Sequence, residues 1–122
     1  MHADPFEQLF EESSNPALVV APLEDRILAA NPAGCAMLGY TLEELLETPV
    51  SRIHPAEMSQ LPEFVQRVLR DGEGSTVTLT CRTKDGTFLP CDVSVMALEG
   101  SRGHLLVLLQ DRSEHRQRRI LG

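Results

Sequence analysis

The chain has 122 residues, of which 18 are acidic and 11 are basic, and its formal net charge is −7. A chain of this length suits one domain, and its acidic balance argues against nucleic-acid binding by the folded core. No apolar run approaches the roughly 18 residues of a membrane-spanning helix, and the N-terminus lacks the basic and apolar regions of a signal peptide, so we expect a cytoplasmic protein with no membrane insertion.

The N-terminus predicts a short helix. Residues 4–7 (DPFE) combine an aspartate that can cap a helix, a proline suited to its first position and a glutamate that completes a capping box. Phe6, Leu9 and Phe10 then fall on one helical face, and the helix is expected to end near residues 13–15. A small core cannot bury all three apolar side chains at one edge, so we predict that they form a homodimer interface.

Two short apolar runs follow, and both are predicted to be strands. Residues 17–21 and 26–30 flank a turn-rich connector at 22–25. Directly after the second run, Asn31 is placed to cap a helix that Pro32 opens. Gly39 suits the left-handed position at which such a helix ends.

Two more helices are predicted before the chain returns to strands. Residues 41–44 (TLEE) form a capping box, and the helix that it starts is expected to run to about Leu46, before Pro49. The next helix carries the most regular apolar stripe in the sequence, with spacing i, i+3, i+4, i+7 and i+8. Its members are Leu61, Phe64, Val65, Val68 and Leu69. Residues 71–72 (DG) close it.

The last third of the chain predicts three strands. Residues 77–81 and 89–95 alternate between apolar and polar side chains with a period of two. The sequence KDG at 84–86 indicates the hairpin between them, because Asp-Gly tolerates positive φ. After a turn at 99–103, residues 105–109 are apolar throughout, which is typical of a strand in the centre of its sheet.

The predicted order is a helix, two strands, several helices, three strands and the start of another helix. This order indicates an α+β fold, with one five-stranded antiparallel sheet and helices packed on one face. We expect an N-terminal cap helix at 1–14, a core at 15–112 and, at 113–122, the start of a linker helix to an output domain.

Six segments in this order resemble motifs of the PAS family of sensory domains. They are NPALVV at 15–20, RILAANPA at 26–33, LGYTLEEL at 38–45, IHPAE at 53–57, RTKDGTF at 82–88 and QDRSEHR at 110–116. The resemblance covers nearly the whole chain. The last segment departs from the family pattern, because Arg112 replaces the usual Ile or Val and Ser113 replaces Thr.

The resemblance implies a signal-input domain of a larger bacterial-type regulator that holds a small ligand or cofactor between the sheet and the helices. The residues argue against two cofactors. Residues 61–70 contain no histidine to ligate haem, and Cys35, in the sequence AGCAM, does not match the Asn-Cys-Arg-Phe motif of light-sensing flavin domains. The cofactor therefore stays unidentified.

Candidate ligand-binding residues come from the helical segment. They are Cys35, Leu38, Phe64 and Val68. The residues that we expect to face inward are all apolar: Val19, Leu28, Leu38, Phe64, Val68, Val93 and Val107. Such a set suits an apolar ligand, and it suits equally a filled core in a constitutive dimerisation module that binds no ligand.

A signal relay is predicted at the C-terminal end of the core. Arg82 and Asp111 are expected to pair across adjacent strands, and Ser113 to cap the outgoing helix. No nucleophile–base set and no metal-ligand cluster is recognisable, so an enzyme is not expected. A tight hairpin would place Cys81 and Cys91 diagonally on one face, beyond comfortable disulfide reach, which favours buried free thiols.

Overall fold

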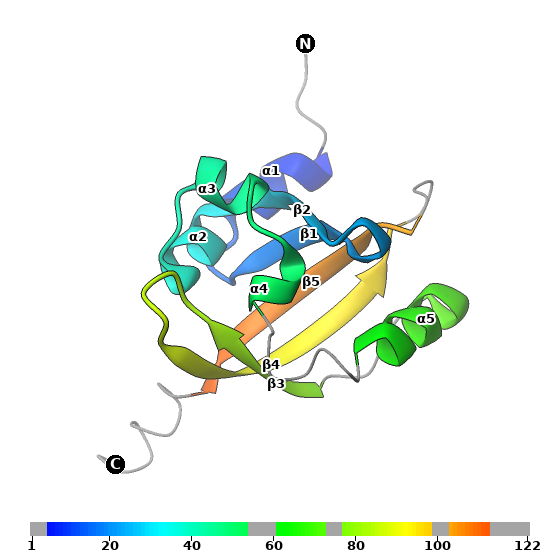
Figure 1. The fold of residues 1–122 in the computed structure, drawn as a ribbon. Coiled ribbons are helices and arrows are strands. Elements are labelled where there is room, and N and C mark those ends of the chain that lie inside the picture. The colour runs from blue at the N-terminus through cyan, green and yellow to red at the C-terminus, as the bar shows by residue number, and fades with distance from the viewer. Residues whose placement is uncertain (1–4, 54–60, 73–76, 99–102, 113–122) are drawn as a thin grey trace, which may run out of the picture.

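The computed structural model describes residues 5–53, 61–72, 77–98 and 103–112 (Figure 1). Its five strands form one antiparallel sheet in the order β2-β1-β5-β4-β3. The strands are β1 (Ala17–Ala21), β2 (Arg26–Ala30), β3 (Val77–Arg82), β4 (Phe88–Ala97) and β5 (Leu105–Asp111). The predicted fold class is confirmed, and the apolar strand β5 lies at the centre of the sheet as expected.

Within the described residues, five helices and one 3₁₀ turn accompany the sheet. They are α1 (Pro5–Glu12), η1 (Pro22–Glu24), α2 (Pro32–Leu38), α3 (Leu42–Leu46), α4 (Val50–Ile53) and α5 (Leu61–Asp71). Figure 1 shows α2, α3 and α4 gathered over one part of the sheet and α5 lying apart from them, beside β4. The helix α4 was not predicted, because four residues are too few to show a helical period.

The predicted caps of α2 and α3 are confirmed. The Asn31 side chain accepts a hydrogen bond from the backbone N–H of Gly34, and Gly39 ends α2 at φ 81°. At α3 the capping box is complete, since the Thr41 side chain accepts from the Glu44 N–H and the Glu44 side chain accepts from the Thr41 N–H. These local bonds satisfy backbone groups that a helix end leaves unpaired, and they fix where each helix begins.

The prediction that Val19 and Leu28 face inward is wrong. The register pairs Val19 with Ala29 and Val20 with Ile27, so Leu28 is an extra residue at a bulge in β2. Neither Val19 nor Leu28 belongs to the buried core, whereas Leu18 and Val20 do. Both strands are apolar at almost every position, so their sequences carry no alternation from which the inward face could be chosen.

Candidate functional site

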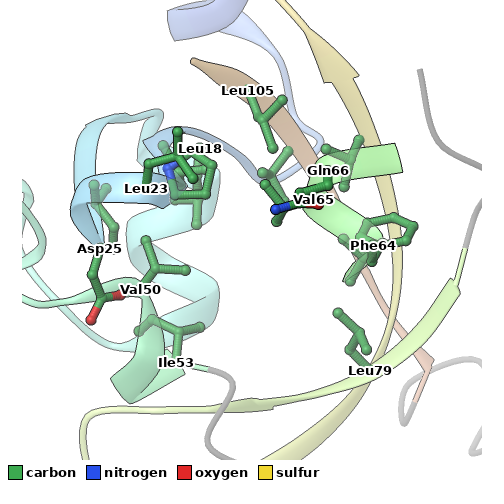
Figure 2. Close-up of a pocket in the computed structure, with 16 residues that line it drawn as sticks. Leu18, Leu23, Asp25, Val50, Ile53, Phe64, Val65, Gln66, Leu79 and Leu105 are labelled. Atoms are coloured by element: carbon green, nitrogen blue, oxygen red, sulfur yellow. The ribbon is translucent and has the colours of Figure 1, made fainter. Parts of the chain in front are cut away.

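A cavity of about 290 Å³ lies between the inner face of the sheet and the helices α4 and α5 (Figure 2). All five strands contribute to its walls, together with η1, α4 and α5. Its lining consists of Leu18, Val20, Pro22, Leu23, Asp25, Ile27, Val50, Ile53, Phe64, Val65, Gln66, Leu79, Val93, Val95, Leu105 and Val107. Apart from Asp25 and Gln66, all of these residues are apolar, so the cavity is an apolar space with two polar groups.

Asp25 connects the turn before β2 to the helix α4. Its carboxylate accepts hydrogen bonds from the Ser51 N–H at 2.8 Å and from the Ser51 hydroxyl at 2.6 Å. Its backbone carbonyl accepts from the Val50 N–H at 3.4 Å. The residue adopts the left-handed conformation at φ 54°, which aspartate tolerates better than most residues. Asp25 therefore holds one wall of the cavity in place with both carboxylate oxygens already engaged.

Gln66 is the second polar group of the lining and comes from the opposite wall. It belongs to α5, between the apolar positions Val65 and Val68, and its side chain is exposed. Figure 2 shows α5 facing the wall formed by Leu23 and Val50 across the cavity. Gln66 thus brings an amide, which can donate and accept, to the rim of the apolar space.

One of the four predicted ligand residues lines this cavity. Phe64 does, whereas Cys35, Leu38 and Val68 do not. Leu38 and Val68 are completely buried against their neighbours, and Cys35 is half-buried on α2. The helical stripe identified side chains that face the sheet, but whether such a side chain meets another atom or an empty space depends on the partner elements.

The walls contributed by the strands were only partly predicted. Val93 and Val107 were expected to face inward, and they line the cavity with Val95 and Leu105 from the same two strands. The alternation in 89–95 was the signal that could have found Val95. No signal in the sequence indicated that the 3₁₀ turn or Ile53 of α4 would complete the opposite wall.

The other half of the helical layer is built around a buried polar side chain, Asn31. Its Oδ1 accepts from the N–H groups of Ala17 at 3.0 Å and Gly34 at 2.8 Å. Its Nδ2 donates to the carbonyls of Phe10 at 3.0 Å and Asn15 at 2.8 Å. All four hydrogen-bonding positions of the amide are therefore used, and one residue joins α1, β1 and α2.

A second connection ties the β3–β4 hairpin to the same half. The Lys84 N–H donates to the Leu38 carbonyl at 2.9 Å, and Lys84 Nζ donates to Glu44 Oε2. The Lys84 hydrogen bond lowers the pKa of the Glu44 carboxyl, with a further contribution from the Thr41 N–H. Polar contacts thus join α2 to α1 and β1 through Asn31, and they join α2 and α3 to the β3–β4 hairpin through Lys84.

The predicted relay pair does not lie on adjacent strands. The strand β4 separates β3 from β5, and Asp111 lies opposite Cys91, which lies opposite Leu79, three positions before Arg82. The alternation of apolar and polar residues identified the strands, but it did not give their order in the sheet. Instead, Arg112 pairs with Asp92 of β4 at 3.6 Å. Ser113 and the expected linker helix at 113–122 lie outside the described residues.

The three cysteines are free thiols. As predicted, Cys81 pairs with Leu89 and Leu79 pairs with Cys91, so both thiols share one face, and both are completely buried. Hydrogen bonding from Cys81 lowers the pKa of Cys91. Burial, and secondarily the charge of Glu11, raises the pKa of Cys35.

The predicted dimer surface is only partly described. Leu9 is 71% exposed, Phe10 is half-buried, and the side chain of Phe6 lies outside the described residues. Two further apolar side chains, Met96 and Leu108, are 45% and 39% exposed on the outer face of the sheet. Apolar surface is therefore available both on α1 and on the sheet.

The described residues contain neither a metal-ligand cluster nor a membrane-spanning helix. No three His, Cys, Asp or Glu side chains are grouped as a metal site would require. Among the described helices, none has the length and apolar character needed to cross a membrane.

Comparison with known proteins gives one consistent result. A family model described as PAS domain matches residues 14–114. The sensor histidine kinase TmoS of Ectopseudomonas mendocina is 30% identical over 102 residues, which are 81% of this chain but only 10% of that kinase.

Solved structures agree. A domain of a sensory box sensor histidine kinase/response regulator from Geobacter sulfurreducens is 25% identical, with a TM-score of 0.73 over 87% of this chain and 90% of that one. A PAS domain from Desulfitobacterium hafniense is 26% identical, with a TM-score of 0.69 over 85% and 98%.

Proposed function

Since the chain belongs to the PAS domain family, we propose that it is the signal-input domain of a larger cytoplasmic signalling protein and binds a small molecule in the cavity between the sheet and α4–α5. The relatives that are domains of sensor histidine kinases support the input role. The proposed role is non-enzymatic, and residues 113–122 would lead into the output domain.

The cavity is the observation that carries the ligand part of the proposal. Protein interiors are packed so closely that voids larger than one water molecule are few. A space of about 290 Å³ is far above that limit and close to the roughly 300 Å³ at which small-molecule sites begin. The walls come from separate elements of the fold, and ligand sites commonly lie between packed elements.

Signal transmission is proposed to follow β4 and β5. Val93 and Val107 of these strands line the cavity, and the same two strands meet at the ion pair between Asp92 and Arg112, where the chain leaves the sheet. A ligand with different affinity for two positions of these strands would shift the population between them. Asp111 and Arg112 would pass that shift to the output domain.

A thermal-shift screen of small metabolites tests the ligand site. It compares the 122-residue chain with Val107→Trp, whose larger side chain enters the cavity, and with Leu106→Trp, whose side chain points to the opposite face of β5. A ligand at 100 times its Kd adds about 2.7 kcal/mol of stability, which raises Tm by about 10 °C in a domain of this size. Hits are expected to stabilise the parent and Leu106→Trp but not Val107→Trp. Equal stabilisation of all three would contradict a site in the cavity.

The alternative function is constitutive dimerisation without a ligand. It is favoured by the exposed apolar side chains of Leu9, Met96 and Leu108, because such surface commonly marks an interface. Light scattering after gel filtration tests it. A dimer that becomes monomeric in Leu9→Ser, or in Met96→Glu with Leu108→Glu, supports an interface at that surface. A parent chain that is monomeric at all concentrations excludes homodimerisation by this chain alone.

A further inference from the structure

We propose that the cavity takes a small uncharged molecule with an apolar body and a single hydrogen-bonding group that faces Gln66. This inference rests on the proposed function, because it names the chemical class of ligand for the same site. It follows from the charge, the polarity and the size of the lining.

The lining favours an uncharged ligand. Among its described residues there is no lysine, arginine or histidine, and Asp25 is the one charged group. Within the described lining, an anion would therefore meet no counter-charge, and Asp25 would add a charge of the same sign. Burying an unpaired charge is far more costly than burying a neutral polar group, so carboxylates and phosphates are disfavoured.

A cation is disfavoured for a different reason. Asp25 could attract an ammonium group, but each of its carboxylate oxygens already accepts a hydrogen bond from Ser51. An ammonium group has three donors, and the apolar side chain of Val50 lies beside Asp25 in the lining (Figure 2). Most of its hydration would be lost without replacement.

Gln66 supplies the polar contact. It lies on the rim, on the α5 side, and its side chain is exposed. Because the amide both donates and accepts, it can bind a hydroxyl or a carbonyl. The deep walls are formed by buried residues of the sheet such as Val93 and Leu105. A bound molecule would thus point its polar end outward and its apolar body toward the sheet.

The volume limits the size of that body. A dry apolar cavity of about 150 Å³ accepts benzene, and this cavity has roughly twice that volume. A single ring with a substituent, or a short branched chain, fits these dimensions. Larger planar cofactors would require the walls to move apart.

Four probes with one carbon skeleton test the inference. They are cyclohexane, cyclohexanol, cyclohexanecarboxylate and cyclohexylammonium, titrated into the 122-residue chain and followed by ligand-observed NMR. Cyclohexanol is expected to bind about fivefold tighter than cyclohexane, which corresponds to one neutral hydrogen bond. Both charged probes are expected to bind at least about 100-fold more weakly than cyclohexanol.

Variants assign the effect to residues. Gln66→Leu is expected to remove the preference for cyclohexanol while cyclohexane still binds. Gln110→Leu is the matched control, because Gln110 is an exposed glutamine on β5 outside the lining, and it is expected to change neither affinity. Val107→Trp is expected to weaken both neutral probes, and a folded circular-dichroism spectrum excludes unfolding as the cause.

The outcomes distinguish a failure of the proposed ligand class from a failure of the proposed ligand site. Tighter binding of the carboxylate or the ammonium than of cyclohexanol overturns the ligand class and leaves the cavity as a ligand site. An unchanged cyclohexanol preference in Gln66→Leu overturns the role of Gln66. If none of the four probes binds, both the ligand class and the proposed site are contradicted.

Discussion

The two halves of the helical layer are attached to the sheet in different ways. The α2–α3 half is fixed by polar contacts: Asn31 makes four hydrogen bonds, and Lys84 joins the hairpin to Leu38 and Glu44. The α4–α5 half meets the sheet through apolar side chains around a cavity. Directional bonds hold one arrangement, whereas apolar contacts tolerate small displacements. We therefore expect the α2–α3 half to be the rigid frame and the α4–α5 half to respond to a ligand.

Two hydrogen-bonded tethers attach the α4–α5 half to the rest of the fold, one at each of its ends. The Gly72 carbonyl, directly after α5, accepts from the Ala97 N–H of β4 at 2.8 Å. At the other wall, Asp25 holds Ser51 of α4. The middle of α5, with Phe64 and Val65, faces the cavity. A displacement of this segment would need no break in either tether.

Asn31→Ala should have the largest effect on stability. The substitution removes the acceptor of the buried N–H groups of Ala17 and Gly34, and it removes one donor to each of the carbonyls of Phe10 and Asn15. We expect a loss of about 3 kcal/mol or more in the free energy of unfolding, since each buried unsatisfied group costs about 1–3 kcal/mol. Urea denaturation measures it, with the exposed Asn15→Ala as a control expected within about 0.5 kcal/mol. A loss below about 1 kcal/mol would contradict the view that Asn31 holds the α2–α3 half as a rigid frame.

Paired truncations compare the two halves next. Leu38→Ala removes a completely buried side chain from the frame, and a loss of about 2–5 kcal/mol is expected. Phe64 faces the cavity and is half-buried, so it has fewer contacts to lose, and Phe64→Ala should cost about 1–2 kcal/mol, below the usual range for phenylalanine. The same denaturation experiment measures both. A larger loss for Phe64→Ala would show that the cavity wall is packed as tightly as the frame.

Ser51→Ala tests the tether of α4. It removes the hydroxyl donor to Asp25 but keeps the backbone N–H donor, so the expected loss is about 1–2 kcal/mol, as for one hydrogen bond to a charged group. Hydrogen exchange of residues 50–53 should accelerate, while that of residues 32–38 should not. Acceleration in both segments would indicate that the two halves are coupled.

The smallest expected effect is on the pH dependence of the free energy of unfolding. The pKa of Glu44 is lowered in the folded chain from its ordinary value of 4.5, so the stability that it contributes is present above about pH 4.5 and is lost as the pH falls through the lowered value. Glu44→Gln should flatten the dependence of stability on pH in this acidic range. At pH 7 and above, the slope of stability against pH should be the same in the variant and the parent. An equally steep acid dependence in the variant would exclude Glu44 as a contributor.

The elements of the fold could be predicted from the sequence because their signals are local. The caps at Asn31 and Thr41, the Asp-Gly hairpin and the alternation in β3 and β4 each involve residues a few positions apart. The other three bonds of Asn31 could not be predicted, since Ala17, Phe10 and Asn15 reach it only through the fold.

The candidate site was predicted less well for a related reason. The apolar stripe of α5 marks the side of that helix that faces the sheet, and it therefore included Val68 together with Phe64. A cavity is a place where side chains of several elements fail to meet, and its position depends on η1, α4 and the strand order, none of which the pattern of one helix contains. The expectation that Arg82 and Asp111 lie on adjacent strands was wrong because β4 lies between β3 and β5.

Amide hydrogen exchange with and without cyclohexanol tests the central claim most directly, because it reports on both halves in one experiment. The account predicts slower exchange in residues 61–72 of the α5 segment and in residues 105–111 of β5 when the probe is bound. It predicts no change in residues 32–38 of α2. Slowing that is equal in α2 and α5, or confined to α2, would contradict a ligand-responsive half beside a rigid frame.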